Sequence, residues 1–320
     1  MEFTRSEAKA WSLEHIKGFY MCPLSPVNDA LKIDEAQLRD NIEQFIGMGI
    51  EGLVMGGFIA ECWNVTMDNW KWYHEVVADA VKGRADLWTI ILDPCVHTAL
   101  EKADFVEKLG FNGAEVINPV VQLRTDDEIF DWFKYFTDRT DLGVCLYRTP
   151  VSGKVLTFDL MQRLADIDTI VGVKQGHLSR AETLKLRKLI RDDFIVSEPM
   201  EAFFCDDLRL GGQVCWGELS YILYGKQRYL VDEYRKQAAA GDWTKAYETN
   251  AKLEPVRELY GDLFLWEVAR TATYASALAN MKAWFEVIGL NAGRMIPPVR
   301  EAGPETKDYI EGKLKELNVI

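Results

Sequence analysis

Residues 143–176 read GVCLYRTPVSGKVLTFDLMQRLADIDTIVGVKQG and contain one complete strand–helix–strand unit. An apolar run, Gly143–Tyr147, is followed by an amphipathic segment, Thr157–Ile167, and then by a second apolar run, Ile170–Lys174. Two buried strands joined through a helix run parallel, because the helix returns the chain to the end of the sheet where the first strand began. This stretch therefore predicts a parallel α/β unit.

The same alternation extends in both directions along the chain. Short β-like runs are expected at Gly18–Cys22, Gly52–Met55, Leu87–Leu92, Gly113–Ile117, Gly143–Tyr147, Ile170–Lys174, Phe194–Ser197 and Gln213–Gly217. Helical patterns are expected at Ile33–Met48, Trp70–Lys82, Ala99–Leu109, Asp127–Arg139, Thr157–Ile167, Ser179–Arg191 and Met200–Leu210. An eight-fold βα alternation closes most simply as an α/β fold of the (β/α)₈ TIM-barrel type.

The remaining sequence lacks β signals. We expect residues 1–220 to form the barrel with a short N-terminal leader, and residues 221–320 to form a helical extension packed on it. No Pro- or Ser-rich linker separates the two parts, so a single structural domain is expected.

Composition limits the function classes. The 320 residues carry a formal charge of −13, which argues against nucleic acid or an anionic membrane as the main partner. We find no export signal and no apolar run of the ~18 residues that a membrane span requires. The six cysteines lie far apart, without zinc-site spacing, so reduced thiols in a cytoplasmic protein are expected.

Polar residues that close apolar strands indicate where the chemistry lies, because catalytic groups of such barrels project from the carboxyl ends of the strands. Lys174 follows IVGV, so its side chain is expected at the barrel interior or mouth. A desolvated lysine has a lowered pKa, and its neutral amine attacks carbonyl groups. The alternative is a strand-end lysine that reaches solvent or an ion pair.

Two further segments end strands in the same way. Tyr147 lies one strand from Lys174 and could relay protons, although a barrel tyrosine bonded to the backbone is the commoner case. Gly56 and Gly57 permit a tight turn whose backbone N–H groups could bind a carboxylate. For Glu61, after that turn, we favour a structural role.

In order and spacing, several motifs resemble those of the dihydrodipicolinate synthase and N-acetylneuraminate lyase superfamily of class I pyruvate aldolases. The matching segments are Ser25-Pro26, GGFIAE in the second-strand loop, YRTP, GVKQG, GGQVCWGEL and IPPVR. The resemblance implies that Lys174 forms a Schiff base with a 2-oxo acid such as pyruvate, and that Tyr147 relays protons. It further implies that the Gly56–Phe58 turn, with Ser25, holds the substrate carboxylate.

The resemblance also has consequences for cofactors and assembly. A protonated imine is itself an electron sink, so neither a metal nor another cofactor is implied. A homotetramer, built as a dimer of dimers, is implied instead.

The departures from the family pattern disfavour synthesis of dihydrodipicolinate. The usual hydroxyl pair of the second-strand loop is replaced by Gly57-Phe58. The arginine of those synthases falls near Ser152, and their tyrosine after the fourth strand is replaced around Asn118-Pro119-Val120.

Within the superfamily, the chain looks most similar to the hydratase-aldolases that cleave arylidene pyruvates. Phe58, Glu61, Cys62 and Thr66 match the loop of that subgroup, whereas Thr149 stands where it has an asparagine. Arg148 could bind a substrate carboxylate or form a structural ion pair. Aromatic surface for stacking on a substrate ring is expected near the strand ends, from Trp63, Trp70, Trp72 and Trp216.

Three hypotheses follow. The first is a lyase that cleaves an aryl-substituted or unsaturated 2-oxo acid, after hydration where needed, to an aldehyde and pyruvate. The second is a sugar-acid aldolase or dehydratase of the same superfamily, which a hydroxyl-rich pocket would favour. The third is a catalytically silent barrel that binds a 2-oxo acid.

Overall fold

Eight parallel strands form the centre of the computed structural model, which describes residues 1–119, 122–176, 179–271 and 273–320. The strands are β1 (Gly18–Met21), β2 (Gly52–Met55), β3 (Asp86–Ile91), β4 (Gly113–Ile117), β5 (Gly143–Arg148), β6 (Ile170–Gln175), β7 (Ile195–Ser197) and β8 (Val214–Glu218). Their order is β7-β6-β5-β4-β3-β2-β1-β8. The edge strands also meet, because the Ser197 hydroxyl donates a hydrogen bond to the Val214 carbonyl at 3.0 Å.

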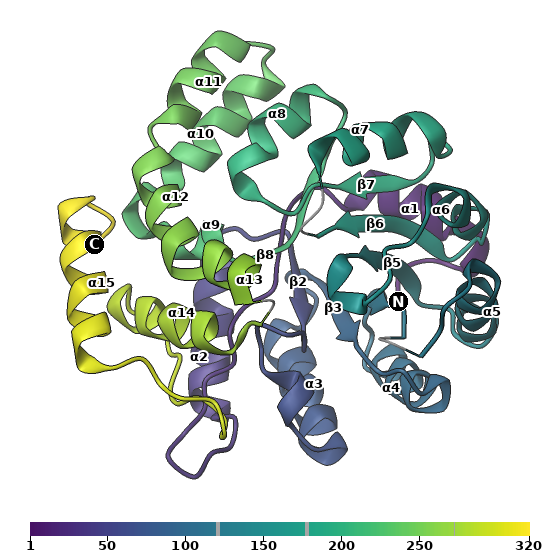
Figure 1. Ribbon diagram of the computed structural model, residues 1–320, viewed down its shortest axis with the longest axis horizontal. Helices are drawn as coiled ribbons and strands as arrows, with labels where there is room; N and C mark the ends of the chain where they lie inside the picture. Colours follow the sequence, from purple (N-terminus) through teal and green to yellow (C-terminus); the bar gives the residue numbers. More distant parts are fainter. Residues whose placement is uncertain (120–121, 177–178, 272) are drawn as a thin grey trace.

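The predicted TIM barrel is therefore confirmed (Figure 1). No strand boundary differs from its predicted position by more than one residue. The outer helices are α2 (Glu35–Gly47), α3 (Met67–Val81), α4 (Val96–Lys108), α5 (Asp126–Thr137), α6 (Phe158–Ala165), α7 (Arg180–Leu189) and α8 (Phe204–Arg209). Side-chain oxygens at the N-caps of several helices accept a backbone N–H and fix where these helices begin, at Asp34, Thr66, Thr125, Thr157 and Ser179.

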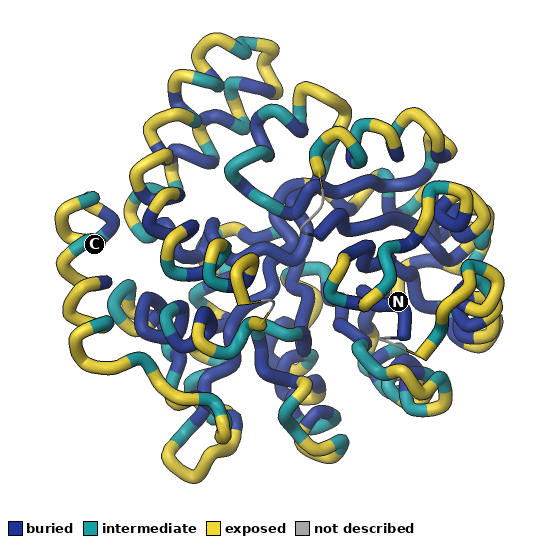
Figure 2. Tube along the Cα trace, in the orientation of Figure 1, coloured by how far each residue is buried: buried dark blue, intermediate teal, exposed yellow. Residues whose placement is uncertain are grey.

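Apolar side chains fill two layers, and Figure 2 shows the strands buried over almost their whole length. One layer lies between the strands and the outer helices and includes Leu53, Val144 and Val173. The other lies inside the barrel and includes Val54 and Trp88. The leader helix α1 (Ala8–His15) packs against this inner layer through Ala8, and the Lys9 ammonium donates to the carbonyls of Ala165 and Ile167.

A run of helices follows the last strand. It comprises α9 (Ser220–Leu223), α10 (Arg228–Ala239), α11 (Trp243–Ala251), α12 (Glu254–Tyr260), a π-helix (Gly261–Leu265), α13 (Trp266–Thr271), α14 (Ala275–Val287) and α15 (Pro304–Glu316). In Figure 1, α10 and α11 lie beside α8, and α15 lies next to α14. None of the described helices has the length and apolarity that crossing a membrane requires.

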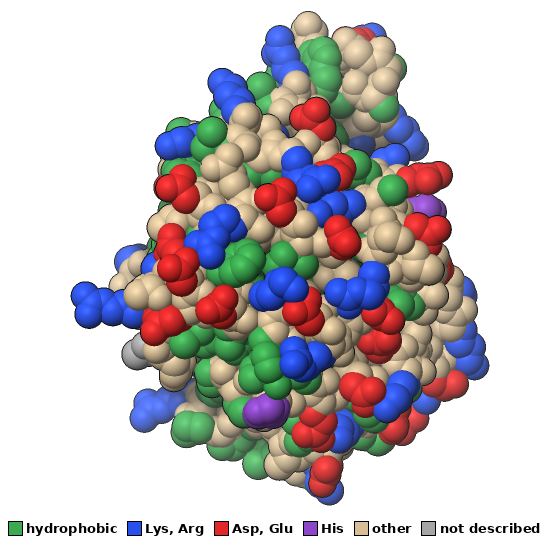
Figure 3. Space-filling model, turned by 90° about the vertical axis from the view of Figure 1, so that its right-hand side faces the viewer, with side chains coloured by type: hydrophobic (Ala, Val, Ile, Leu, Met, Phe, Trp, Pro, Cys, Tyr) green, Lys and Arg blue, Asp and Glu red, His purple; other side chains and the backbone are tan. Residues whose placement is uncertain are grey.

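The charged side chains on the surface of this acidic protein are mixed. On the face that Figure 3 shows, basic side chains are interspersed with acidic ones rather than gathered into one patch. Such mixing provides no continuous basic track for a phosphate backbone.

A buried polar network connects the barrel to the C-terminal helices. Glu201, in the segment after β7, pairs with Arg257 of α12 through contacts of 2.9 and 3.0 Å. The hydroxyls of Tyr224 and Tyr234 each donate to the same carboxylate at 2.7 Å. All of these groups are buried, so the charges of Glu201 and Arg257 must each offset the cost of burying the other.

We predict that Arg257→Met destabilises the protein strongly, because it leaves the Glu201 carboxylate buried without its cation. Loss of one partner of a buried pair costs about 3–5 kcal/mol of the free energy of unfolding, measured by urea denaturation. Arg270→Met is the control, since Arg270 pairs with Glu267 on the surface, and its cost is about 1 kcal/mol or less. Equal, small effects of the two substitutions would contradict the role given to the network.

Candidate active site

The side chain of Lys174 lies inside the barrel near the carboxyl end of β6. In the strand register, Lys174 stands between Tyr147 of β5 and Ser197 of β7. The residue is only 8% exposed, and its Nζ donates to the Gly217 carbonyl at 3.2 Å. Nζ also lies 4.6 Å from the centre of the Tyr147 ring. The structure thus places a buried amine beside a phenol at the barrel mouth.

Glycine is required where β8 passes this amine. Gly217 has a φ of +67°, which side chains other than glycine rarely adopt, and a Cβ there would lie 2.6 Å from Lys174 Nζ. A glycine at this position therefore allows the backbone carbonyl to reach the amine.

Glu115 is a buried acidic partner of Lys174 that the sequence analysis missed. It lies on β4, is 1% exposed, and places Oε2 3.5 Å from Lys174 Nζ. The Trp216 indole donates to the same oxygen at 2.8 Å. The available signal was a single charged residue in the apolar strand GAEVI, because such a residue inside a barrel requires a partner.

The pair reverses our expectation for the Lys174 pKa. Burial is the largest single effect and disfavours the ammonium, but Glu115, together with smaller effects of Cys22, Tyr274 and Cys145, raises the Lys174 pKa above its ordinary value. The prediction of a lowered pKa is therefore wrong for the unliganded protein. Formation of the neutral amine requires that the proton be passed to another group.

Tyr147 also lies at the mouth and is 3% exposed. Its hydroxyl is 3.4 Å from that of Tyr274, which precedes α14, and the Tyr274 ring stacks on Phe58 at 5.3 Å. Burial, aided by the Glu115 charge, raises the pKa of Tyr147 to about 12. The phenol is therefore protonated at neutral pH, which suits a proton donor.

A cavity of about 70 Å³ opens above Lys174 and Tyr147. Phe264 and Leu265 of the π-helix, together with Tyr274, line it from the C-terminal helices. π-Helical turns occur frequently at functional sites. The carboxylate of Glu218, at the end of β8, lines the same cavity.

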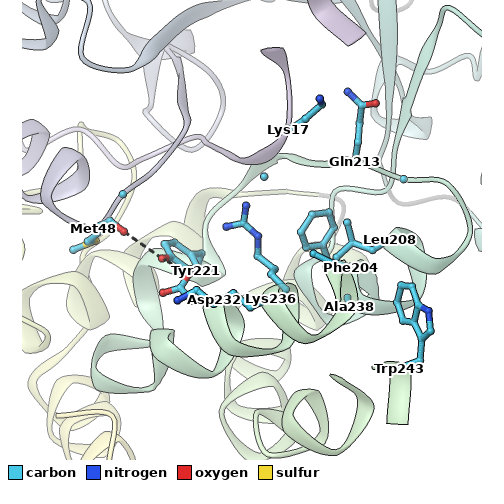
Figure 4. A pocket seen from close by; sticks show the side chains of 15 residues that line it. Lys17, Met48, Phe204, Leu208, Gln213, Tyr221, Asp232, Lys236, Ala238 and Trp243 are labelled. Carbon is cyan, nitrogen blue, oxygen red and sulfur yellow. Dashed lines mark hydrogen bonds between the residues drawn. The ribbon is translucent and has the colours of Figure 1, made fainter. Parts of the chain in front are cut away.

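A second cavity is larger, about 730 Å³, but lies at the opposite end of the barrel (Figure 4). Lys17 and Gln213, just before β1 and β8, line it together with Tyr221 and residues of α10. Because such barrels carry out their chemistry at the carboxyl ends of the strands, we assign the candidate active site to the smaller cavity.

The Gly56–Phe58 turn lies next to this site without lining its cavity. The turn is closed by bonds from Glu61 N to the Phe58 carbonyl and from Cys62 N to the Gly57 carbonyl. Ser25 is fully buried, beside the phenol of Tyr73. Carboxylate binding by Ser25 and the turn stays a prediction.

Glu61 has buried partners on the C-terminal part of the chain. Its carboxylate lies 2.6 Å from the Lys282 ammonium of α14 and accepts the Ile296 N–H at 2.9 Å. Glu61 itself adopts a left-handed φ of 55°. These contacts favour the structural role, because they fix the loop after β2 to the C-terminal helices.

Three other predicted substrate-binding residues lie outside the cavity lining. Arg148 is buried, pairs with Glu182 at 2.7 Å and donates to the Leu156 carbonyl, which favours the ion-pair alternative. Thr149 caps a short 3₁₀ turn. Trp216 packs inside the barrel against Tyr20 and Trp88, with ring centres 5.0 and 4.9 Å away, so its role here is to orient Glu115.

The tryptophans predicted around the loop after β2 differ in exposure. Trp63 is exposed and Trp70 is buried, and neither lines the cavity. Of the segment that departs from the synthase pattern, Val120 lies outside the described residues.

The fold and the mouth define a class of protein, a (β/α)₈ barrel with a buried lysine, a tyrosine and a carboxylate at the carboxyl ends of its strands. A model of the dihydrodipicolinate synthetase family matches residues 15–317. The chain therefore belongs to that family and is a Schiff-base enzyme of the lyase or aldolase type.

Similar proteins cover nearly the whole chain. A 4-hydroxy-tetrahydrodipicolinate synthase of Methanopyrus kandleri is 24% identical over 95% of this chain and 97% of its own. A Bacillus subtilis protein named "probable 5-dehydro-4-deoxyglucarate dehydratase" is 25% identical over 90% and 89%. The solved dihydrodipicolinate synthase of Thermotoga maritima shares the fold, with a TM-score of 0.81 at 20% identity over 96% and 100%.

We predict that Glu115→Gln lowers the pKa of Lys174, because the substitution removes the negative charge that favours the ammonium. The pKa is measured from the pH dependence of reductive methylation of Lys174 by formaldehyde and cyanoborohydride, followed by peptide mass spectrometry. Glu101→Gln removes a carboxylate that pairs with Lys71 at the surface and should leave the Lys174 profile unchanged. An unchanged profile in Glu115→Gln would show that Glu115 does not control the amine.

Proposed function

We propose that the protein is a lyase that binds a 2-oxo acid through a Schiff base on Lys174 and releases pyruvate. Its substrate carries an aryl or unsaturated apolar group, and water is added before cleavage where the substrate has a carbon–carbon double bond. Family membership supports the Schiff base, and the position of Lys174 at the barrel mouth supports this lysine as its site.

The groups around Lys174 can perform each proton transfer of imine formation. Glu115 accepts the ammonium proton, and the neutral amine then attacks the carbonyl carbon. One proton passes from the attached nitrogen to the carbinolamine oxygen, the phenol of Tyr147 supplies a second, and the oxygen leaves as water. The protonated imine then accepts the electron pair released when the carbon–carbon bond beyond the third carbon breaks.

The lining of the cavity is the observation that carries the substrate class. Its apolar side chains include Ile59, Met200, Phe264 and Leu265. Aromatic and apolar surfaces of this kind gain free energy by burying a ring or an unsaturated chain.

We predict that borohydride reduction in the presence of pyruvate adds a pyruvyl group to the peptide that contains Lys174. Lys174→Ala should lose the adduct, since no other amine lines the cavity among the described residues. Lys226→Ala, at an exposed lysine, is the control and should retain it. Absence of an adduct in the wild type would instead support the catalytically silent barrel.

A dehydratase acting on a hydroxylated diacid is the second candidate. The B. subtilis relative favours it, as do the hydroxyls of Tyr260 and Tyr274 at the cavity. Against it, Lys174 is the single cation in the described part of the cavity lining, and Arg148 is bound to Glu182. A second substrate carboxylate would therefore be buried without a partner.

We predict that the protein converts trans-benzylidenepyruvate to benzaldehyde and pyruvate and leaves 5-dehydro-4-deoxyglucarate unchanged. The first substrate would bury an uncharged ring at the distal end of the cavity, whereas the second would bury a carboxylate without a partner. Pyruvate release from the first and dehydration of the second are followed at equal concentrations. The opposite preference would establish the dehydratase.

The homotetramer stays a prediction, and the mass of the particle in solution decides it. Large aromatic side chains are exposed on the C-terminal helices, among them Tyr229 and Trp266. They provide surface of the type that subunit interfaces bury.

A further inference from the structure

Glu218 is a carboxylate of the cavity with no role in the steps described so far. It is the last residue of β8, directly after Gly217, whose carbonyl receives the Lys174 bond. It is 7% exposed and lines the cavity together with Lys174 and Tyr147. A substrate bound to Lys174 would therefore occupy a cavity that Glu218 also lines.

The neighbours of Glu218 fix it in place. The backbone N–H of Ser220 donates to Oε2 at 2.5 Å, and the Ser220 hydroxyl donates to the same oxygen. The phenol of Tyr260, on α12, lies against the carboxyl group as a further donor. These donors keep the carboxyl group buried and hold it in a fixed orientation, which suits proton transfer.

The other groups of the site are unsuited to act as a base on the bound substrate. Glu115 lies outside the cavity lining, bound to Trp216 and Lys174. Burial raises the pKa of Tyr147 and of Tyr274, so both phenols stay protonated near neutral pH. Glu218 is the single acidic side chain in the described lining of the cavity.

We propose that Glu218 is the base that removes a proton from the oxygen at the fourth carbon of the imine-bound substrate. This inference rests on the proposed function and adds a residue to it. In hydration the oxygen belongs to the attacking water. In cleavage it belongs to the resulting hydroxyl group.

The two steps balance without any other reactant. In hydration, Glu218 takes a proton from water, the oxygen bonds to the fourth carbon, and the double-bond electrons move toward the imine to form an enamine. The proton then passes from Glu218 to the third carbon and restores the imine. In cleavage, Glu218 takes the hydroxyl proton, the bond between the third and fourth carbons breaks, and an aldehyde leaves the pyruvate enamine.

The ionisation of Glu218 suits this role. Burial raises its pKa to about 7, against the opposing effect of hydrogen bonds from Ser220 and Tyr260. The titratable or charged groups that face it from the neighbouring elements are Lys174, Glu201, Cys215, Tyr224, Tyr260 and Tyr274. Because the base must be ionised, turnover should rise with pH through about 7.

The test compares the wild type with Glu218→Gln, Glu218→Asp and, as control, Glu258→Gln at an exposed position of α12. Trapping with pyruvate and borohydride reports the imine, and turnover of trans-benzylidenepyruvate between pH 5 and 9 reports the later steps. Glu218→Gln should trap pyruvate like the wild type, while its kcat falls by about 100-fold or more, the usual contribution of a general base. Its residual activity should lack the rise near pH 7, and Glu218→Asp should recover part of the turnover.

Other outcomes separate the two proposals. Wild-type kcat and pH profile in Glu218→Gln would overturn the role of Glu218 and leave the proposed function intact. Loss of pyruvate trapping in a Glu218→Gln protein with a wild-type melting temperature would also overturn it, by placing Glu218 in imine formation. A wild type that traps no pyruvate, or that traps it but does not consume trans-benzylidenepyruvate, would overturn the proposed function and this inference together.

Discussion

An ammonium group inside a barrel is the constraint around which this structure is organised. The low dielectric of the interior makes the charge of Lys174 costly, and Glu115 and the Gly217 carbonyl compensate for it. Trp216 holds Glu115 in turn, so β4, β6 and β8 are connected through polar groups in the middle of the barrel. Burial of such a pair seldom gains stability over an apolar pair of the same volume. The arrangement is therefore better explained by reactivity than by folding.

The C-terminal helices belong to this site as well as to the fold. They contribute Tyr260, Phe264 and Tyr274 to the cavity above the strands. Two buried ion pairs fix them to loops at the carboxyl ends of the strands, Glu201 with Arg257 and Glu61 with Lys282. The strands and the loops after them thus supply the amine, the carboxylates and most of the residues that line the cavity, and the C-terminal segment covers it with aromatic and apolar side chains.

Much of the fold could be predicted because its signals are local. Apolar runs, most of them beginning at or near a glycine, located the strands, and the chemistry at strand ends selected Lys174 and Tyr147. Glu115 was missed because one charged residue in an apolar run does not show which partner lies across the barrel. Tyr260 lies on α12 and Tyr274 just before α14, both about a hundred residues beyond Lys174, and only tertiary packing brings them to the mouth.

The errors in the predicted site also arise from contacts that only tertiary packing creates. The sign of the Lys174 pKa shift was wrong because desolvation can be inferred from one strand, whereas the opposing charge comes from another. Trp216 was expected to stack on a substrate ring, and alternation along β8 does direct it inward. It stands two positions before Glu218, however, and this difference in depth places it below the amine rather than at the mouth.

The small cavity indicates that the strands provide the catalytic groups, whereas the C-terminal helices determine which substrates fit. Its volume of about 70 Å³ is well below the roughly 300–1,000 Å³ of typical ligand pockets. The strand side is held by the sheet and its buried ion pair, so an aryl substrate gains room only where Phe264 and Leu265 shift. These residues lie on a π-helix, a type of turn that occurs frequently at functional sites. A family that retains its lysine while varying this helical side can therefore change substrate without rebuilding its catalytic groups.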